Sequence, residues 1–148
     1  MNITAFQLAE RFIGVDEWVG AQTNPMILAM LKLDVSWPTD DSVPWCSALP
    51  NFVCWLLRLP RSKSLLARSW LGVGQSVKLE QAKVGFDVVI LNRGGPTDPT
   101  KPGPGHVGFY AGTEGKHVLI LGGNQGDTVN VTRFLAKDIL GIRRLLQE

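Results

Sequence analysis

Residues 105–124 read GHVGFYAGTEGKHVLILGGN, and this stretch decides the fold. Two apolar runs, 106–112 and 116–122, flank a turn that contains Gly112 and Gly115. This pattern predicts an antiparallel β-hairpin. Further strands are expected at residues 77–79, 87–92, 128–133 and 140–144. The second half of the chain is therefore predicted to form an antiparallel meander.

The first half of the chain has the 3.6-residue apolar period of helices. Helices are expected over residues 4–13, 25–33, 46–57 and 65–71. Thr4 and Gln7 fit a capping box, and Asn24 followed by Pro25 fits the start of the second helix. Helices followed by an antiparallel sheet predict the α+β class.

The composition predicts one soluble domain over residues 1–148. The 148 residues are 45% hydrophobic and 19% charged, with a formal net charge of +2, which excludes a disordered chain. Residues 1–50 carry a net charge of −4 and the rest a net charge of +6, without a nucleic-acid-binding motif. We therefore expect no nucleic-acid partner, a monomer, and no room for a separate wall-binding module.

The N-terminal residues MNITAFQLAERFIGVDEWVG lack a basic segment before a long apolar run. This pattern is not that of a secretory signal, so we expect synthesis in the cytoplasm. The apolar runs are far shorter than the roughly 20 residues that span a bilayer, so no membrane insertion is expected.

The two cysteines, Cys46 and Cys54, differ in their surroundings. Eight residues apart on one helix, they would lie about 12 Å apart, too far for a disulfide. Cys54 lies within an apolar run and is interpreted as a buried core residue. Cys46 follows Pro44-Trp45 at the expected start of a helix, where N–H groups stabilise a thiolate. No metal-ligand spacing is present, and we expect no cofactor.

The base that would serve Cys46 is either His106 or His117. His106 begins a strand after a loop, 93–105, that contains four prolines and four glycines. A three-residue turn over 113–115 would place His106 opposite Gly122 and His117 about 16 Å further down the hairpin. His106 is thus the candidate base, and His117 is interpreted as a surface residue.

The same register would place Asn124 beside His106, where its amide could orient the imidazole. Spacing alone does not separate this role from that of a polar turn over residues 124–127. A two-residue hairpin turn would instead put Asn124 on the other face of the sheet.

Five short motifs occur in an order that resembles a phage-associated branch of the CHAP and NlpC-type peptidoglycan cysteine hydrolases. They are residues 44–48 (PWCSA), 67–70 (ARSW), 105–110 (GHVGFY), 121–125 (LGGNQ) and 141–144 (GIRR). The resemblance covers about residues 20–145. It implies a papain-like fold in which N-terminal helices, including the one that carries the nucleophile, pack on a C-terminal antiparallel sheet.

The resemblance also implies site residues. Cys46 matches the nucleophile, His106 the base and Asn124 the orienting residue of CHAP-type members. The family has an acidic residue four positions before the cysteine, where this chain has Ser42 with Asp41 adjacent. The expected substrate contacts are Trp37, Asp41, Trp45 and Gln125.

The implied activity is hydrolysis of a stem-peptide amide or of the muramoyl–L-alanine bond in peptidoglycan. With no signal peptide, a phage endolysin is expected, which would reach the wall after release by a holin-type partner. The alternatives are an injected antibacterial amidase effector with an immunity protein, a catalytically inactive wall-binding domain, and a transferase that uses the same three groups.

Overall fold

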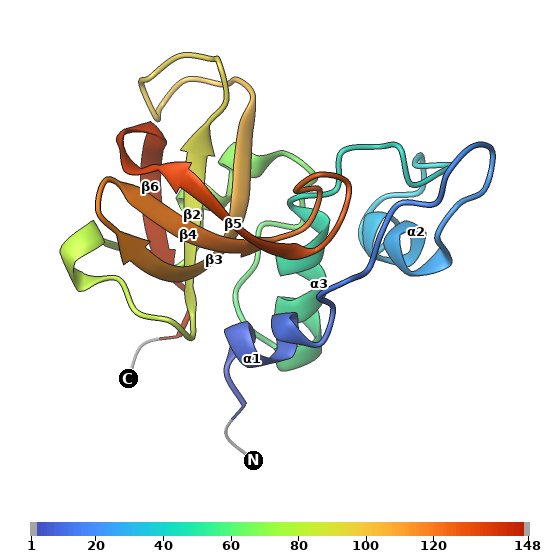
Figure 1. Ribbon diagram of the computed structural model, residues 1–148, viewed down its shortest axis with the longest axis horizontal. Coiled ribbons are helices and arrows are strands. Elements are labelled where there is room, and N and C mark those ends of the chain that lie inside the picture. The colour runs from blue at the N-terminus through green and yellow to red at the C-terminus, as the bar shows by residue number, and fades with distance from the viewer. Residues whose placement is uncertain (1–2, 147–148) are drawn as a thin grey trace.

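The computed structural model describes residues 3–146 (Figure 1). The α-helices within this range are α1 (Ala5–Glu10), α2 (Pro25–Leu31) and α3 (Ala48–Leu57), and the 3₁₀ helices are η1 (Ala67–Gly72), η2 (Leu79–Gln81) and η3 (Ala136–Asp138). The strands are β1 (Gln75–Val77), β2 (Asp87–Asn92), β3 (Gly105–Glu114), β4 (His117–Gly122), β5 (Asn130–Leu135) and β6 (Ile139–Arg144). The predicted α+β class is confirmed.

One antiparallel sheet contains all of these strands, in the order β1-β6-β2-β3-β4-β5 (Figure 1). Strands β2 to β5 form the expected meander. Strand β6 departs from it, because the chain returns across the sheet to pair β6 with β2. This return places β2 and β3 in the middle of the sheet, where both edges of each strand are paired.

Both faces of the sheet are covered by apolar side chains. Val88 and Ile90 of β2 pack into the core that the sheet shares with the helices. Val89 and Leu91, which alternate with them, belong to a second apolar cluster on the other face. Because β2 is buried on both faces, its sequence is continuously apolar rather than alternating.

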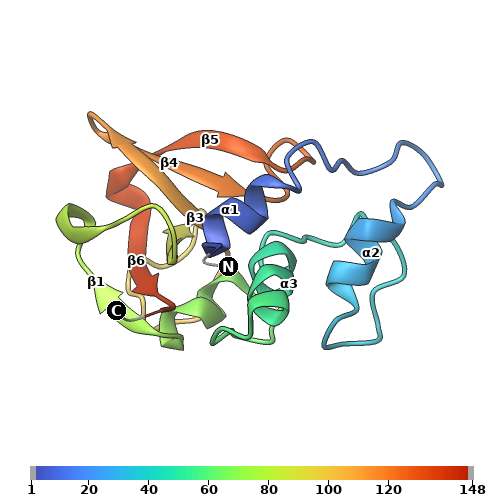
Figure 2. The ribbon, with the colours of Figure 1, turned by 90° about the horizontal axis from the view of Figure 1, so that it is seen from below.

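The helices begin at the caps that the sequence predicts. Thr4 and Gln7 form the capping box of α1, and the Asn24 side chain accepts from the N–H of Met26 at the start of α2. Helices α1 and α3 lie beside the sheet, whereas α2 lies farther out and contacts α3 (Figure 2). No helix within residues 3–146 combines the length and apolar character that crossing a membrane requires.

The hairpin of β3 and β4 has a different register from the one predicted. His117 pairs with Glu114, so the turn has two residues, Gly115 and Lys116, instead of three. A bulge between Tyr110 and Gly112 then shifts the pairing by one residue. The prediction that His106 faces Gly122 across the hairpin was therefore wrong.

Candidate active site

Cys46 lies in the turn just before α3, not inside its first turn as predicted, because the helix begins at Ala48. Its side chain is almost buried, with 6% of the residue exposed. Backbone N–H groups of Val107, Ser47 and Cys46 itself face the sulfur. Since Val107 follows His106 directly, the Cys46 sulfur lies next to the part of β3 that carries the histidine.

A buried polar network holds the segment that carries Cys46. The Ser47 hydroxyl donates to the Ser64 carbonyl at 2.6 Å and accepts from the Trp70 indole N–H at 2.8 Å. The Asn51 amide donates to the carbonyls of Ser47 and Ser64 at 3.1 and 3.0 Å. These bonds join the start of α3 to the segment before η1, so the sulfur is attached to a rigid part of the molecule.

His106 is held in a single tautomer by Gln125. The Gln125 Nε2 group donates to the carbonyl and side-chain oxygens of Asn130, both at 2.8 Å. The Gln125 Oε1 atom, 2.8 Å from His106 Nε2, must therefore accept a hydrogen bond. The proton of the neutral imidazole is thus on Nε2, and the lone pair is on Nδ1.

The Nδ1 atom of His106 is buried and has no hydrogen-bond partner among the described residues. His106 itself is 2% exposed, and its ring packs against Phe134 with the ring centroids 5.1 Å apart. An orphaned buried acceptor is unusual in a folded protein and favours a chemical role. In this protein the orphaned acceptor is the lone pair on Nδ1 of His106. This lone pair is free to take a proton, and His106 directly precedes Val107.

Burial keeps both groups neutral at rest. It lowers the pKa of His106 below its ordinary value of 6.5, although the hydrogen bond to Gln125 acts in the opposite direction. Burial also raises the pKa of Cys46 above its ordinary value of 9.0, although the three backbone N–H groups act to lower it. The prediction of a thiolate stabilised by the helix start was therefore wrong for this state, because burial outweighs the N–H groups.

Two glycines at the end of β4 let the site assemble. A Cβ atom at Gly122 would lie 2.6 Å from Gln125 Oε1 and 3.4 Å from His106 Nε2. A Cβ atom at Gly123 would lie 2.5 Å from the ring of Trp45. A larger residue would displace the Gln125 side chain at the first position and the Trp45 ring, next to Cys46, at the second.

The structure does not bring Asn124 to His106. Gln125, which was expected to contact substrate, is instead buried and takes the position beside the imidazole that was predicted for Asn124. Strand β4 ends at Gly122, and Asn124 adopts a left-handed backbone with φ of +58°. This turn directs the next side chain, that of Gln125, back to the imidazole. The two-residue hairpin turn does not account for this by itself, because the bulge near Tyr110 pairs Phe109 with Leu121 and so keeps Gly122 on the face of His106.

Trp45, predicted to contact substrate, belongs to the core. It is 0% exposed, and its indole N–H donates to Glu17 at 2.8 Å. Its ring covers Gly123 instead of facing solvent. The prediction of a substrate contact at Trp45 was wrong, because the tryptophan packs the nucleophile segment against the end of β4.

Asp41 also has a structural role. One of its carboxylate oxygens accepts from the backbone N–H groups of Trp18 and Asn24, both at 2.8 Å, and the residue is 4% exposed. The prediction that it contacts substrate was therefore wrong, because this carboxylate ties together the connections on either side of α2. Trp37 is exposed and stays a prediction as a substrate contact.

The other cysteine and histidine lie away from this pair. Cys54 is fully buried in α3, and burial raises its pKa to about 12, so its thiol is unreactive. His117 starts β4 opposite Glu114, eight residues along β3 from His106, which corresponds to about 26 Å. His117 therefore cannot assist the reaction of Cys46.

Arg68 organises the long loop that leads to His106. Its guanidinium donates to five oxygens at 2.9 to 3.5 Å, namely those of Asn92 (side chain), Pro96, Asp98, Lys101 and Pro104. The loop is irregular because of its prolines and glycines, and Arg68 supplies the hydrogen bonds that it cannot make internally. The sequence showed Arg68 only as part of a motif, without this role.

Comparison with models of known protein families and with curated protein sequences finds no match. Function is therefore inferred from the chemistry of the site. Within the described part of the chain, no group of three His, Cys, Asp or Glu residues is placed to hold a metal ion. What the site does offer is a buried thiol, a buried imidazole with a free lone pair on the residue before Val107, and backbone N–H donors.

Replacing Gln125 should matter far more than replacing Asn124. We expect Gln125→Ala to lower kcat/KM for the hydrolysis proposed below about ten- to a hundredfold, the cost of leaving a buried N–H without its acceptor. Asn124→Gly, which removes the amide and keeps the left-handed backbone, should change it less than about twofold. The measurement is the initial rate of each variant on the same substrate.

The pH profile of Gln125→Ala tests whether Gln125 orients His106 or only stabilises the fold. Because the bond to Gln125 raises the pKa of His106, its loss should move the acidic limb of kcat/KM in Gln125→Ala to lower pH. An unshifted acidic limb in Gln125→Ala, or an equal loss of activity in Asn124→Gly, would contradict the assignment of Gln125.

Proposed function

We propose that this chain is a papain-like cysteine hydrolase that cleaves an amide bond in bacterial peptidoglycan. The observation that carries the proposal is the free Nδ1 lone pair of buried His106, whose opposite ring nitrogen is held by Gln125 and whose neighbour in the chain, Val107, directs its N–H at the Cys46 sulfur. This arrangement of nucleophile, base and orienting amide is that of a thiol acyl-transfer site. The nucleophile before a helix and the base on an antiparallel sheet support the papain-like comparison.

In the proposed reaction the Cys46 proton passes to Nδ1 of His106 as the sulfur attacks the amide carbonyl. A C–S bond forms, the carbonyl becomes a tetrahedral oxyanion, and the C–N bond then breaks. His106 returns the proton to the departing amine, which leaves a thioester on Cys46. Water, deprotonated by the same Nδ1, attacks the thioester, and the products are a carboxylic acid and the restored thiol.

The surroundings of the pair fit these steps. Backbone N–H groups of Cys46 and Ser47 are donors that could hold the oxyanion, because they already face the sulfur. Gln125 would keep the proton on Nε2 of His106 throughout, so that Nδ1 is the atom that exchanges protons. The low exposure of both residues excludes most water from the reacting groups.

The wall substrate is supported by the resemblance of the five motifs to peptidoglycan cysteine hydrolases. The bond is either one in the stem peptide or the muramoyl–L-alanine bond. The biological setting that we propose is a phage endolysin, released to the wall by a holin-type partner. An injected amidase effector would use the same site and would be accompanied by an immunity protein.

Digestion of purified sacculi tests the proposed reaction. Mass spectrometry of the released fragments should find new amino groups and new carboxyl groups in equal amounts, since amide hydrolysis produces one of each. The identity of the fragments would also name the bond. An added amine acceptor should leave the products unchanged, because water is the proposed acceptor.

Three results would contradict this proposal. Intact sacculi that retain bound protein would indicate a wall-binding domain without activity. Fragments with new reducing sugar ends and no new amino groups would indicate cleavage of the glycan. Ligation of the fragments to the added amine would indicate a transferase.

A further inference from the structure

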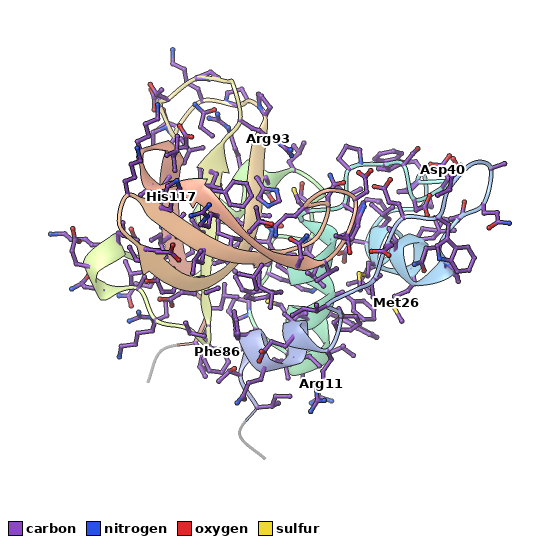
Figure 3. All side chains as sticks on the ribbon, in the orientation of Figure 1. Arg11, Met26, Asp40, Phe86, Arg93 and His117 are labelled. Carbon is purple, nitrogen blue, oxygen red and sulfur yellow. The ribbon has the colours of Figure 1, made fainter. Side chains whose placement is uncertain are left out.

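Arg93 lies at the end of the sheet closest to the candidate active site. It follows the last residue of β2, where Leu91 pairs with His106 of β3. Figure 3 shows Arg93 where the long β2–β3 connection leaves the sheet. The chain therefore carries a cation at the edge of the site, two residues beyond the strand position that faces His106.

The charge of Arg93 reaches both reacting groups. It acts to lower the pKa of Cys46 and that of His106. The position of Arg93 in the chain agrees with this, because it lies two residues beyond Leu91, the strand partner of His106. Arg93 is the charged side chain that the two groups share as an electrostatic neighbour.

The guanidinium of Arg93 is also available to a ligand. The side chain is exposed and, within residues 3–146, makes no hydrogen bond or ion pair with another side chain. Other arginines are occupied: Arg68 holds the loop, and Arg61 forms an ion pair with Asp34 at 2.6 Å. A free guanidinium beside a nucleophile is suited to a planar anion, which it can bind through two parallel N–H groups.

We propose that Arg93 binds a carboxylate of the substrate close to the amide bond that Cys46 attacks. The substrate class is accordingly a peptide that carries a free carboxylate beside the cleaved bond, preferred over the same peptide with a carboxamide there. This inference rests on the proposed hydrolysis and names a specificity residue for it. The competing role, in which Arg93 only makes the Cys46–His106 pair more acidic, would act on all substrates alike.

The test compares two forms of the same sacculi. One preparation is untreated, and in the other the carboxylates are converted to carboxamides with ammonia and a carbodiimide. The wild-type protein should release fragments about five- to tenfold faster from the untreated sacculi, the range of a well-formed charged hydrogen bond. Arg93→Gln should lose this preference and work on both at the rate of the wild type on amidated sacculi.

Two further variants test whether the preference depends on the guanidinium of Arg93 itself. Arg93→Lys should restore part of the preference, because the charge is kept and the planar fork is lost. Lys101→Gln removes one positive charge from the same loop and should keep the full preference, which controls for general attraction to an anionic wall. Lys101 is exposed, and its side chain is not part of the site.

The possible results distinguish a failure of the role of Arg93 from a failure of the proposed hydrolysis. A wild-type protein that digests both preparations equally, an equal loss on both in Arg93→Gln, or a lost preference in Lys101→Gln would overturn the role of Arg93 while the proposed hydrolysis stands. If the wild type releases fragments from neither preparation, the hydrolysis itself is contradicted and the inference fails with it.

Discussion

Cys46→Ala should reduce fragment release from sacculi by at least about a thousandfold, the scale on which removal of a nucleophile acts in hydrolases that use a catalytic triad. Without the sulfur no thioester can form, and the remaining N–H donors and His106 can only assist direct attack by water. The measurement is the initial rate of release, with thermal unfolding of the variant as a check that it is folded. Binding to sacculi should persist, because the backbone around residue 46 is held through Ser47 and not through the thiol.

Cys54→Ala is the matched control for the loss of a thiol. Cys54 lies in α3, the helix that follows Cys46, and is fully buried. Its pKa of about 12 and its apolar surroundings leave it without a chemical role. The activity of Cys54→Ala should match that of the wild type. Its free energy of unfolding should fall by about 1 kcal/mol because of the missing contacts. If Cys46→Ala digests sacculi as fast as the parent, or if only Cys54→Ala is inactive, the proposed nucleophile is wrong.

His106→Ala should have an effect of similar size, about a thousandfold. The thiol of Cys46 has a raised pKa, so it does not ionise on its own near neutral pH and needs a base to take its proton. His106 is the base with a free lone pair, whereas His117 lies at the other end of the hairpin. His117→Ala should therefore retain wild-type activity, and an equal loss in both histidine variants would contradict the observed register.

The pH dependence of the wild type follows from the same two groups. The reaction requires neutral His106, and burial lowers its pKa below 6.5. Activity should therefore be retained as the pH falls through 6.5 and should decline only at lower pH, when Nδ1 becomes protonated. A decline in kcat/KM that is already complete above 6.5 would contradict a buried, neutral base.

The elements of the fold were predictable because their signals are local. The capping box of Thr4 and Gln7, the Asn24 cap with Pro25, and strand β2 each depend on residues a few positions apart. The pairing of β6 with β2 was not predictable in the same way. The pairing of β6 depends on which strand edge is left free after the meander has formed. That edge is set by the whole sheet and not by any short segment of the sequence.

The hydrogen-bond partner of His106 could not be predicted from the sequence. The left-handed backbone of Asn124, just beyond the end of β4, decides that Gln125 reaches the imidazole. The shorter turn and the bulge near Tyr110 move the register by two residues and leave the faces of the strands unchanged, so one left-handed residue sets the partner. The roles of Trp45 and Asp41 were missed for a related reason, since burial of a side chain depends on segments far away in the sequence.

The sequence by itself determined that helices precede an antiparallel sheet, that a helix starts close to Cys46, and that His106 lies at the start of a strand after a long irregular loop. These features follow from caps, apolar periods and turn residues, whose energies act over a few positions. The tertiary structure alone decided that Gln125 holds the imidazole, that burial keeps Cys46 and His106 neutral, and that the Arg93 side chain has no ion-pair partner within residues 3–146. Hydrogen-bond partners, desolvation and unpaired charge are set by groups that only folding brings together.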